Sequence, residues 1–589
     1  MNFLKTFFAS LLAVVVGSGL VVLLCVLFFA GMVAAMGSSA PAVVTSSSVL
    51  KLDVGSVTDS PGGSPFSSFD FASMKMARNT TLLKTIQAIQ AAADDDRIEG
   101  IYINFDENTS IDLASLEEIR AQLVRFRESG KFVVAYQESW SQVAYWFASA
   151  ADKVYANPAG GLQWTGLSAS VMFYKGLLDK LGIEPIVVRH GEFKSAVEPF
   201  ILDGMSPENR LQYEKLTGSL WGMMVEEVAA SRGISESDLQ AAADNLTIDS
   251  PASAEKLGMI DGLRYQDEVE AELAQLSGLE EGDEAKIVSF GDYAAQVSDN
   301  NPASKNKIAI IYAEGEIVSG KGGPNQVGSA SMVEKIRQAR DDEDAVAVVL
   351  RINSPGGSAL ASEVMWRELE LLKAEKPLVV SMGATAASGG YYIAAPADAI
   401  YASRSTLTGS IGVFGLFANV GDALESRLGV TTDVVNTGRY ADLGSMMRSP
   451  SVAEMDYLQK SVEDVYSTFV GHVADGRNMT PEAVDAIGQG RVWAGEDALE
   501  IGLVDGYGGL VDAISLAADR VGVSEDFRVW EVTGEVSPFD ALFSGMTASV
   551  RDRILRNELG TSFRHYESLR GMLDGEGVQA RMPYVLEVR

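Results

Sequence analysis

Two kinds of hydrophobic pattern alternate along most of the chain. Short runs of β-branched and other apolar residues, such as 98–104 (IEGIYIN) and 345–353 (AVAVVLRIN), have the length of buried strands. Between such runs lie longer stretches in which apolar residues recur at helical spacing, for example 82–96 and 332–344. The alternation of buried strands with amphipathic helices predicts an α/β fold in which helices cover a sheet.

The amino-terminal segment has a different pattern, because residues 7–36 contain no charged side chain. This stretch exceeds the roughly 20 residues that cross a bilayer, whereas the apolar core of a signal peptide spans about 7–15. We therefore expect residues 1–45 to form an uncleaved transmembrane anchor. Lys5 precedes the span and residues 37–50 carry no charge, so the positive-inside bias places the rest of the chain outside the cytoplasm. A signal peptide cleaved near residues 34–39 is the alternative.

The strand and helix pattern repeats itself at a spacing of about 245 residues. Matching segments are 49–57 and 307–317, 131–137 and 376–383, 145–157 and 391–403, and 254–263 and 498–508. A tandem repeat predicts two related domains, which we place at 46–297 and 307–538, joined by a polar linker at 298–306. Residues 539–589 lie beyond the repeat and form a C-terminal tail, to which the sequence assigns no role.

Composition narrows the range of functions. The chain has 80 acidic and 47 basic residues and a net charge of −33, which argues against a nucleic-acid surface because phosphate is bound by Lys and Arg. A neutral or apolar substrate fits this charge better. The single cysteine, Cys25, and the three histidines argue against a zinc site. We expect no metal and no cofactor.

Ser388 occupies a position that suits a nucleophile. It lies where the apolar run 378–383 gives way to a helical stretch, and Gly389 follows it directly. A side chain at such a junction projects from the turn, and amides at a helix start stabilise developing negative charge. The structural alternative is a helix N-cap, since serine is favoured there.

The segment NSPGGS at 353–358 follows another apolar strand. Gly356 and Gly357 carry no side chains, so a turn at this point leaves its amides accessible and lets a substrate approach. We interpret it as a candidate oxyanion hole. An ordinary turn is the alternative interpretation.

Comparison of the two repeats shows that each half lacks a different part of such a site. The first-half position equivalent to Ser388 is Gln142, and the counterpart of the Pro-Gly-Gly turn is FDEN at 105–108. Conversely, Lys194 in the first half matches Ala441 in the second. We therefore predict one composite site, to which the first half contributes a lysine and the second half a serine.

A lysine amine can remove the proton of a serine hydroxyl when burial lowers the lysine pKa toward neutrality. Lys194 lies among apolar neighbours, including Phe193 and Val197, which favours this role. One alternative is an exposed, solubilising lysine. Another is a Ser-His-Asp triad with His190 as the base, although no acidic partner for it is evident.

Together these motifs resemble the signal peptide peptidase A (protease IV) family in its long tandem form. The resemblance extends from the apolar span to about residue 540 and includes KSAVEPF, INSPGGS, TAASGGYY and LTGSIG. It implies a Clp-protease/crotonase-like fold in each half and serine endopeptidase activity on cleaved signal peptides and other hydrophobic peptides, through an acyl-enzyme. It also implies a homotetramer in the cytoplasmic (inner) membrane, with the catalytic domains on the periplasmic side.

The resemblance further assigns roles to individual residues. It implies Ser388 as nucleophile, Lys194 as general base, Gly356 or Gly357 together with Gly389 as oxyanion donors, and Ser410 as the residue that orients the lysine. Two other classes remain open at this point. A crotonase-like acyl-CoA enzyme would use the same oxyanion turn, although anionic CoA suits an acidic, exported chain poorly. A non-catalytic membrane scaffold would not need the retained serine, lysine and glycines.

Overall fold

The computed structural model describes residues 16–20, 43–61, 69–70, 75–76, 80–105, 111–297, 301–323, 325–533 and 578–582. Most of the predicted anchor and of the C-terminal tail, and residues 298–300 of the predicted linker, lie outside these ranges. Across the described ranges, no helix combines the length and the apolar character needed to cross a membrane.

The first half contains a six-stranded sheet whose strands are all parallel, in the order β10-β8-β7-β6-β1-β11. Its strands are β1 (Ser48–Asp53), β6 (Ile98–Asn104), β7 (Phe132–Gln137), β8 (Lys153–Ala156), β10 (Gly262–Leu263) and β11 (Lys286–Ser289). Its helices are α2 (Leu82–Asp94), α3 (Leu113–Glu128), α4 (Gln142–Ala148), α8 (Glu236–Asp244), α9 (Pro251–Leu257), α10 (Gln266–Leu276) and α11 (Phe290–Ala294). Parallel strands need crossover connections, and these helices supply them.

The second half repeats this plan in the order β22-β18-β17-β15-β12-β23, and β17 also pairs with β19, which continues to the antiparallel β21. Its strands are β12 (Lys307–Glu314), β15 (Ala345–Ser354), β17 (Leu378–Ala387), β18 (Ala399–Ala402), β19 (Leu407–Gly409), β21 (Val492–Ala494), β22 (Gly506–Tyr507) and β23 (Arg528–Glu531). Its helices are α12 (Ser329–Asp341), α13 (Ala359–Lys373), α14 (Gly389–Ala394), α17 (Pro481–Ile487), α18 (Gly495–Glu500) and α19 (Leu510–Arg520). The two sheets confirm the predicted α/β class.

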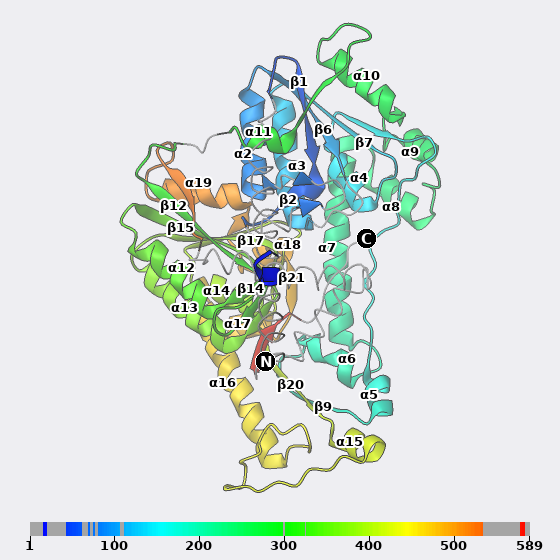
Figure 1. Ribbon diagram of the computed structural model, residues 1–589. Coiled ribbons are helices and arrows are strands. Elements are labelled where there is room, and N and C mark those ends of the chain that lie inside the picture. The colour runs from blue at the N-terminus through cyan, green and yellow to red at the C-terminus, as the bar shows by residue number, and fades with distance from the viewer. Residues whose placement is uncertain are drawn as a thin grey trace, which may run out of the picture.

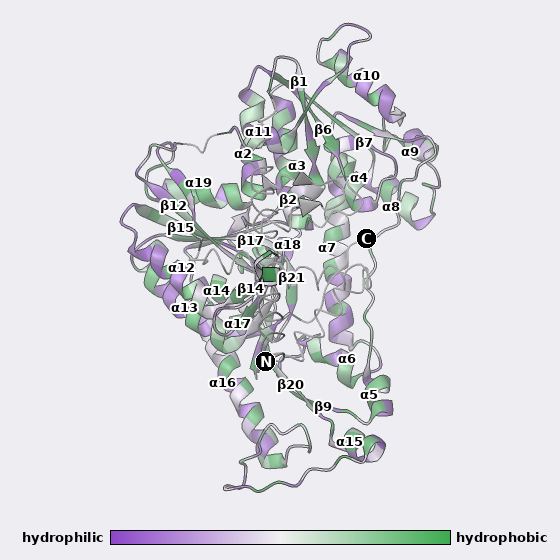
Figure 2. Ribbon diagram, in the orientation of Figure 1, coloured by the Kyte–Doolittle hydropathy of each residue, from purple (hydrophilic) through white to green (hydrophobic). Residues whose placement is uncertain are grey.

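The buried strands account for this arrangement. Most residues of β6 and β15 are buried, as expected for parallel strands that are covered on both faces. Figure 2 shows hydrophobic residues concentrated on the strands and hydrophilic residues along the outer faces of α12 and α13. The sequence marked a strand at 378–383, but β17 continues to Ala387, because its last residues pair with β19.

A third sheet joins the two halves, in the order β14-β13-β16-β24-β20-β9. β9 (Glu184–His190) of the first half pairs antiparallel with β20 (Val413–Asn419) of the second along its whole length. The other strands are β13 (Glu316–Val318), β14 (Gln326–Gly328), β16 (Gly356–Ser358) and β24 (Val578–Arg581). β24 comes from the C-terminal tail and lies between β16 and β20, so residues 578–581 of the tail pair with strands of the second half.

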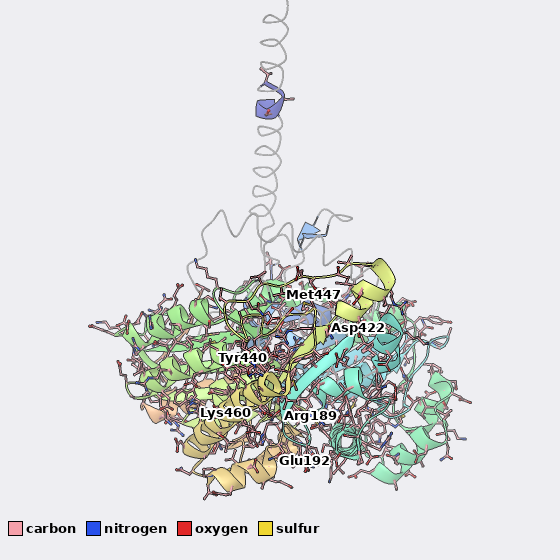
Figure 3. All side chains as sticks on the ribbon, turned by 90° about the horizontal axis from the view of Figure 1, so that it is seen from below. Arg189, Glu192, Asp422, Tyr440, Met447 and Lys460 are labelled. Atoms are coloured by element: carbon pink, nitrogen blue, oxygen red, sulfur yellow. The ribbon has the colours of Figure 1, made fainter. Side chains whose placement is uncertain are left out.

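Figure 3 looks at the face formed around this β9–β20 pair. The Arg189 carbonyl of the first half accepts the side-chain amide of Gln459 of the second half at 3.2 Å, while Asp422 lies toward the other end of the strand pair. Beside the strands, α5 (Lys175–Leu181) approaches α15 (Gly421–Leu428): a β carbon built on Gly182, which ends α5, would lie 3.3 Å from the Ala423 backbone. An arm of the first half is thus packed onto the second half.

Two 26-residue helices, α7 (Pro207–Arg232) and α16 (Val452–Arg477), are repeat counterparts. α7 runs down the centre of Figure 1 and connects the two cores. Its Leu216 packs in a cluster of second-half residues that includes Ala387, whereas its Met224 lies in the first-half core. The helix is fixed by the Ser206 cap and by Gly233 in the left-handed conformation.

A buried group of charges also ties the halves together. Arg351 of β15 donates to Glu118 of α3 at 2.8 Å and pairs with Asp59 at 2.9 Å. Glu118 in turn accepts the amide of Leu510 at 2.8 Å. Removing one member of such a group leaves an uncompensated buried charge, which typically costs about 3–5 kcal/mol. The relative position of the two halves is therefore strongly specified.

Shorter elements complete the fold: the single turns η1 (Val54–Ser56) and η2 (Ser195–Val197), helix α6 (Glu198–Ile201), and the strand pairs β2 (Val57–Thr58) with β5 (Thr80–Thr81) and β3 (Phe69–Asp70) with β4 (Lys75–Met76). Of these, η2 matters most for the site, because it begins directly after Lys194.

Candidate active site

Ser388 sits between the end of β17 and the start of α14, with φ 57° and ψ −114°. Its amide donates to the Gly409 carbonyl of β19 at 2.8 Å, and its own carbonyl accepts the Tyr392 amide at 2.8 Å. A positive φ at a non-glycine residue costs on the order of 1–3 kcal/mol and persists only where the surroundings impose it. The strand pairing and the helix start impose it here.

Lys194 reaches Ser388 from the other half of the chain. It follows β9, and its Nζ lies 2.9 Å from Ser388 Oγ. The same Nζ lies 3.0 Å from Ser410 Oγ and 3.2 Å from the Ser410 carbonyl oxygen. All three residues are fully buried. The structure thus brings together, within one chain, the serine and lysine that the repeat comparison placed in separate halves, along with Ser410.

Two glycines of the second half make room for the stem of Lys194. A β carbon built on Gly490 would lie 2.6 Å from Lys194 Cβ, and one built on Gly412 would lie 3.2 Å from Lys194 Cδ. Gly490 also has φ +80°, a conformation that favours glycine. Next to it, Gln489 accepts the Phe193 amide at 2.9 Å. The lysine is therefore held at both its backbone and its side chain.

Burial holds the pKa of the Lys194 amine well below its ordinary value. Among the described residues, no carboxylate forms an ion pair with this amine that would offset the desolvation. An uncompensated buried cation is costly, so the neutral amine is favoured. A neutral amine has a lone pair, which can accept the Ser388 hydroxyl proton while its two N–H groups donate to Ser410.

The Pro-Gly-Gly turn lies beside Ser388 and has an unusual backbone. Gly356 has φ +92° and Gly357 has φ +156°, which explains the need for glycines. The Gly356 amide donates to Ser354 Oγ at 3.2 Å, and a β carbon on Gly356 would lie 2.6 Å from the Gly389 amide nitrogen. Gly356 therefore keeps the space in front of the Gly389 amide clear, and its own amide is already used.

Comparison with protein families matches this chain to the model of peptidase family S49 over residues 125–280 and 370–524, together more than half of the chain. The chain belongs to peptidase family S49. One family match falls in each repeat, as two tandem domains require. The match sets aside the acyl-CoA enzyme alternative.

Three relatives illustrate the breadth of the S49 similarity. Protease 4 of Salmonella typhi is 40% identical over 82% of this chain and 78% of its own length. The chloroplastic serine protease SPPA of Arabidopsis thaliana is 34% identical over 84% of this chain and 73% of its own. A putative signal peptide peptidase SppA of Enterococcus faecium is 33% identical over 43% of this chain and 77% of its own. The protein is accordingly a serine-type peptidase, whose substrates are peptides.

The histidine considered as an alternative base is engaged elsewhere in this S49 peptidase. The His190 ring stacks on Tyr466, with ring centroids 3.9 Å apart and an interplanar angle of 21°. His190 also lies at the end of β9, opposite Val413 in the strand pairing. The side chain that contacts Ser388 Oγ is that of Lys194.

The first half of the S49 pair has filled the equivalent site with other contacts. Gln142, which matches Ser388 in the repeat, is fully buried and is the first residue of α4, whereas Ser388 directly precedes α14. Its side-chain oxygen accepts the amides of Thr165 at 2.9 Å and Gly166 at 3.0 Å. Of the segment that replaces the oxyanion turn, residues 106–108 lie outside the described ranges. The residue that matches Lys194, Ala441, is exposed.

Sequence reasoning missed several residues that position the lysine. Gln212 of α7 is fully buried, donates to Ser195 Oγ at 3.4 Å, and accepts the Val492 amide at 2.7 Å. It links the lysine loop, α7 and β21. The Gly-Gln-Gly segment at 488–490 was an available signal for the Gly490 contact, but a glycine pair alone does not reveal what it packs against.

Proposed function

We propose that this S49 peptidase is a membrane-bound serine endopeptidase in which Ser388 attacks the peptide carbonyl and Lys194 is the general base. The observation that carries the proposal is the 2.9 Å separation between Lys194 Nζ and Ser388 Oγ, with both side chains fully buried. At this distance a proton passes directly between the two atoms. Burial supplies the lowered lysine pKa that such a base requires.

The reaction follows from these contacts. Neutral Lys194 accepts the Ser388 proton as the Oγ–C bond forms, and the resulting ammonium then protonates the leaving amine as the peptide C–N bond breaks. The product is an ester between Ser388 and the acyl half of the peptide. Water then attacks this ester, with Lys194 again accepting the proton and returning it to Ser388. The two contacts to Ser410 orient the lysine amine throughout.

Negative charge develops on the carbonyl oxygen during both attacks, and we assign its stabilisation to the amides of Gly357 and Gly389. The sequence left Gly356 and Gly357 as alternatives. The bond from the Gly356 amide to Ser354 Oγ favours Gly357 as the donor. Each such donor is typically worth about 2.7–4 kcal/mol in the transition state.

The substrates we propose are cleaved signal peptides and other hydrophobic, extended peptides. Three features support this: the apolar span 7–36 would keep the enzyme at the membrane, the net charge of −33 suits neutral substrates, and one relative is named a putative signal peptide peptidase. By the charge bias at the span, the catalytic domains would face the periplasmic side of the inner membrane.

We also propose assembly with further copies of the chain, to a homotetramer. β9 and β20 pair within one chain, but their repeat equivalents, residues 431–437 and 168–174, form no strand. The first of these segments exposes 53% of Val434 and 95% of Val435, and the second exposes 51% of Met172. Pairing of one copy's 431–437 with another's 168–174 would repeat the β9–β20 contact, and such head-to-tail contacts close into rings. Val435→Glu should then reduce the mass measured by analytical ultracentrifugation; an unchanged mass contradicts this contact.

Mass spectrometry after reaction with an acylating serine probe tests the catalytic proposal. The wild-type chain should carry the probe on Ser388, and Lys194→Ala should carry little or none over the same time. Labelling at another serine, or equal labelling of Ser388 in the two proteins, would contradict the assignment. The matched control is Lys180→Ala, because Lys180 is an exposed lysine of the same arm.

A further inference from the structure

The strand β24 from the C-terminal tail lies directly in the candidate active site. It pairs antiparallel with β16, the strand formed by the Pro-Gly-Gly turn, through Gly356 with Arg581 and Gly357 with Ala580. On its other edge it pairs antiparallel with β20. In Figure 1 it is the short red strand near β20. An extended peptide that binds to a protease by strand addition takes such a place between two strands.

The register of this pairing places one carbonyl of the tail against the proposed oxyanion donors. The Met582 amide donates to the Pro355 carbonyl at 2.7 Å, and hydrogen-bonded pairs alternate along an antiparallel ladder. The next hydrogen-bonded pair is therefore Gly357 with Ala580, in which the Gly357 amide faces the Ala580 carbonyl.

The glycines around this carbonyl support the same placement. A β carbon built on Gly356 would lie 2.2 Å from the Ala580 oxygen, and one built on Gly389 would lie 3.1 Å from that oxygen. The Ala580 oxygen thus rests against the residue that follows Ser388. A carbonyl at this point occupies the position of the bond that a serine peptidase attacks.

Most side chains of β24 and that of Met582 also lie in buried positions, as those of a bound peptide would. Met582 is buried among Leu216, Ala387, Leu407, Val492 and Ala494. Arg581 is 7% exposed and donates to Glu316 of β13 at 2.6 Å. Ala580 is fully buried. These contacts define a position for a small residue, then an acidic partner for a basic residue, then an apolar pocket.

The fit of the tail is incomplete at one position. Gln579 is 3% exposed, and its side-chain oxygen has no hydrogen-bond partner among the described residues. Leaving a buried polar atom unpaired typically costs about 1–3 kcal/mol. A strand that served the fold alone would gain from an apolar residue here, whereas a strand that must leave the site is better held by an imperfect fit.

We propose that residues 578–582 are a tethered pseudosubstrate that occupies the peptide-binding groove of the same chain and competes with incoming peptides. In naming Ala580 as the residue at the attack position, the proposal rests on the catalytic roles proposed above. The competition itself rests on the strand pairing. It follows that a preferred peptide has a small residue before the attacked bond, a basic residue after it and an apolar residue next.

The test uses binding in place of turnover. Ser388→Ala is introduced into the full chain and into a chain that ends at residue 577, and binding of a fluorescent peptide VQARMPYV is followed by anisotropy. Because a tethered segment acts at an effective concentration of up to about 1 mM, the full chain should bind at least about tenfold more weakly than the shortened one. Equal affinities, or no binding to either protein, would overturn the proposal.

A second pair of variants covers the case in which the shortened chain fails to fold. In the full chain, Arg581→Glu places a carboxylate against Glu316 and should release the tail, so that the peptide binds about as tightly as to the shortened chain. Adding Glu316→Arg restores opposite charges between the tail and β13. Because this change also repels the arginine of VQARMPYV, the peptide VQAEMPYV is used here, and the full-length double variant should bind it more weakly than a Glu316→Arg chain that ends at residue 577. A loss of thermal stability in Arg581→Glu without any gain in peptide binding would show that β24 is purely structural. Because none of these readouts needs catalysis, a chain that binds in this way but hydrolyses nothing would contradict only the proposed function.

Discussion

The two halves of this protein share the order of six parallel strands, to which the second half adds β19 and β21, and they share a helix plan, yet the same structural position carries different chemistry in each. At the start of the helix after the third core strand, the second half has Ser388 with a positive φ, and the first half has Gln142, whose side-chain oxygen accepts two backbone amides. At the position of Gly490, beside the lysine stem, the first half has Leu246. The second half has kept a strained site with the serine and the glycine turn, and the first half has replaced its own with satisfied contacts.

The comparison shows how a duplicated domain can divide one site between its copies. The first half no longer needs its own nucleophile, because its arm, β9 and the loop that follows it, carries Lys194 into the second half. The equivalent segment of the second half carries Ala441 at an exposed position instead. Substitutions at equivalent positions should therefore have unequal effects. Changes to the catalytic site, Lys194 included, should lower activity, and changes at the replaced positions of the first half should alter stability.

The largest expected effect is on activity, from the lysine. Lys194→Ala should lower kcat by at least about 10⁴-fold. The base and the nucleophile act together, so removing the base alone abolishes most of the rate enhancement. Steady-state peptide hydrolysis measures it, with circular dichroism to verify folding. Ala441→Lys, the matching change in the other half, should neither restore activity in this variant nor change it in the wild type. Activity retained by Lys194→Ala would contradict the division of the site.

A smaller loss of activity is expected from Gly490. Gly490→Ala places a β carbon 2.6 Å from Lys194 Cβ, which must displace the amine, and a displacement of about 1 Å can cost about 10²-fold in rate. We expect kcat to fall by about this factor while KM changes little, because Gly490 packs on the lysine and not on the tail. A rise in KM with kcat unchanged would show instead that Gly490 acts on peptide binding.

A substitution at the first-half counterpart of Ser388 should lower the free energy of unfolding and leave activity unchanged. Gln142→Ala leaves the amides of Thr165 and Gly166 without their side-chain acceptor. Thr165 is exposed and Gly166 is half-buried, so water can replace part of these contacts, and we expect a loss of about 0.5–1.5 kcal/mol for each bond. Urea unfolding should show a loss of this size, while kcat per folded molecule is unchanged. The exposed Gln163→Ala is the control and should stay within about 0.5 kcal/mol of wild type. A large fall in kcat for Gln142→Ala would mean that the first half still takes part in catalysis.

The smallest expected effect is a gain. Leu246 has φ 51° and is 65% exposed, so Leu246→Gly should relieve backbone strain at little cost in buried area. A gain of about 1 kcal/mol follows from the left-handed penalty of an L-residue. Thermal unfolding measures it, and peptide hydrolysis should not change. A destabilised variant would show that Leu246 makes a contact which its exposure does not reveal.

Much of the fold could be predicted from two features of the sequence. Buried parallel strands appear as continuous apolar runs, and the internal repeat predicts that the two halves contain similar sheets. The site could be named for two reasons. Ser388 and Lys194 each differ in residue type from their repeat counterparts, Gln142 and Ala441, and Gly389 and Ser410 lie within the family motifs TAASGGYY and LTGSIG. The third sheet could not be predicted. β9 and β20 are half-buried strands from different halves, and their pairing depends on how the halves are oriented.

The strand in the C-terminal tail, β24, could not be predicted from the sequence either. Residues 578–581 (VQAR) have neither a long apolar run nor a repeat partner, so nothing in them indicates that they pair with the Pro-Gly-Gly turn. The choice of Gly357 over Gly356 required the contact of the Gly356 amide with Ser354. Such contacts lie between segments that are close in space, and single-sequence patterns do not encode them.

The central claim is that Lys194 is a buried, neutral base for Ser388, and the pH dependence of Ser388 acylation tests it most directly. The rate of probe attachment is measured by mass spectrometry across the pH range in which the protein stays folded. Because only the neutral amine accepts a proton, and burial holds the Lys194 pKa well below its ordinary value, the rate should rise with pH through one ionisation and level off below pH 10. In Lys194→Ala the remaining rate should be small and should lack that ionisation. A wild-type acylation rate that is independent of pH would contradict Lys194 as the base. So would a Lys194→Ala variant whose acylation rate is as high as that of the wild type and rises with pH in the same way.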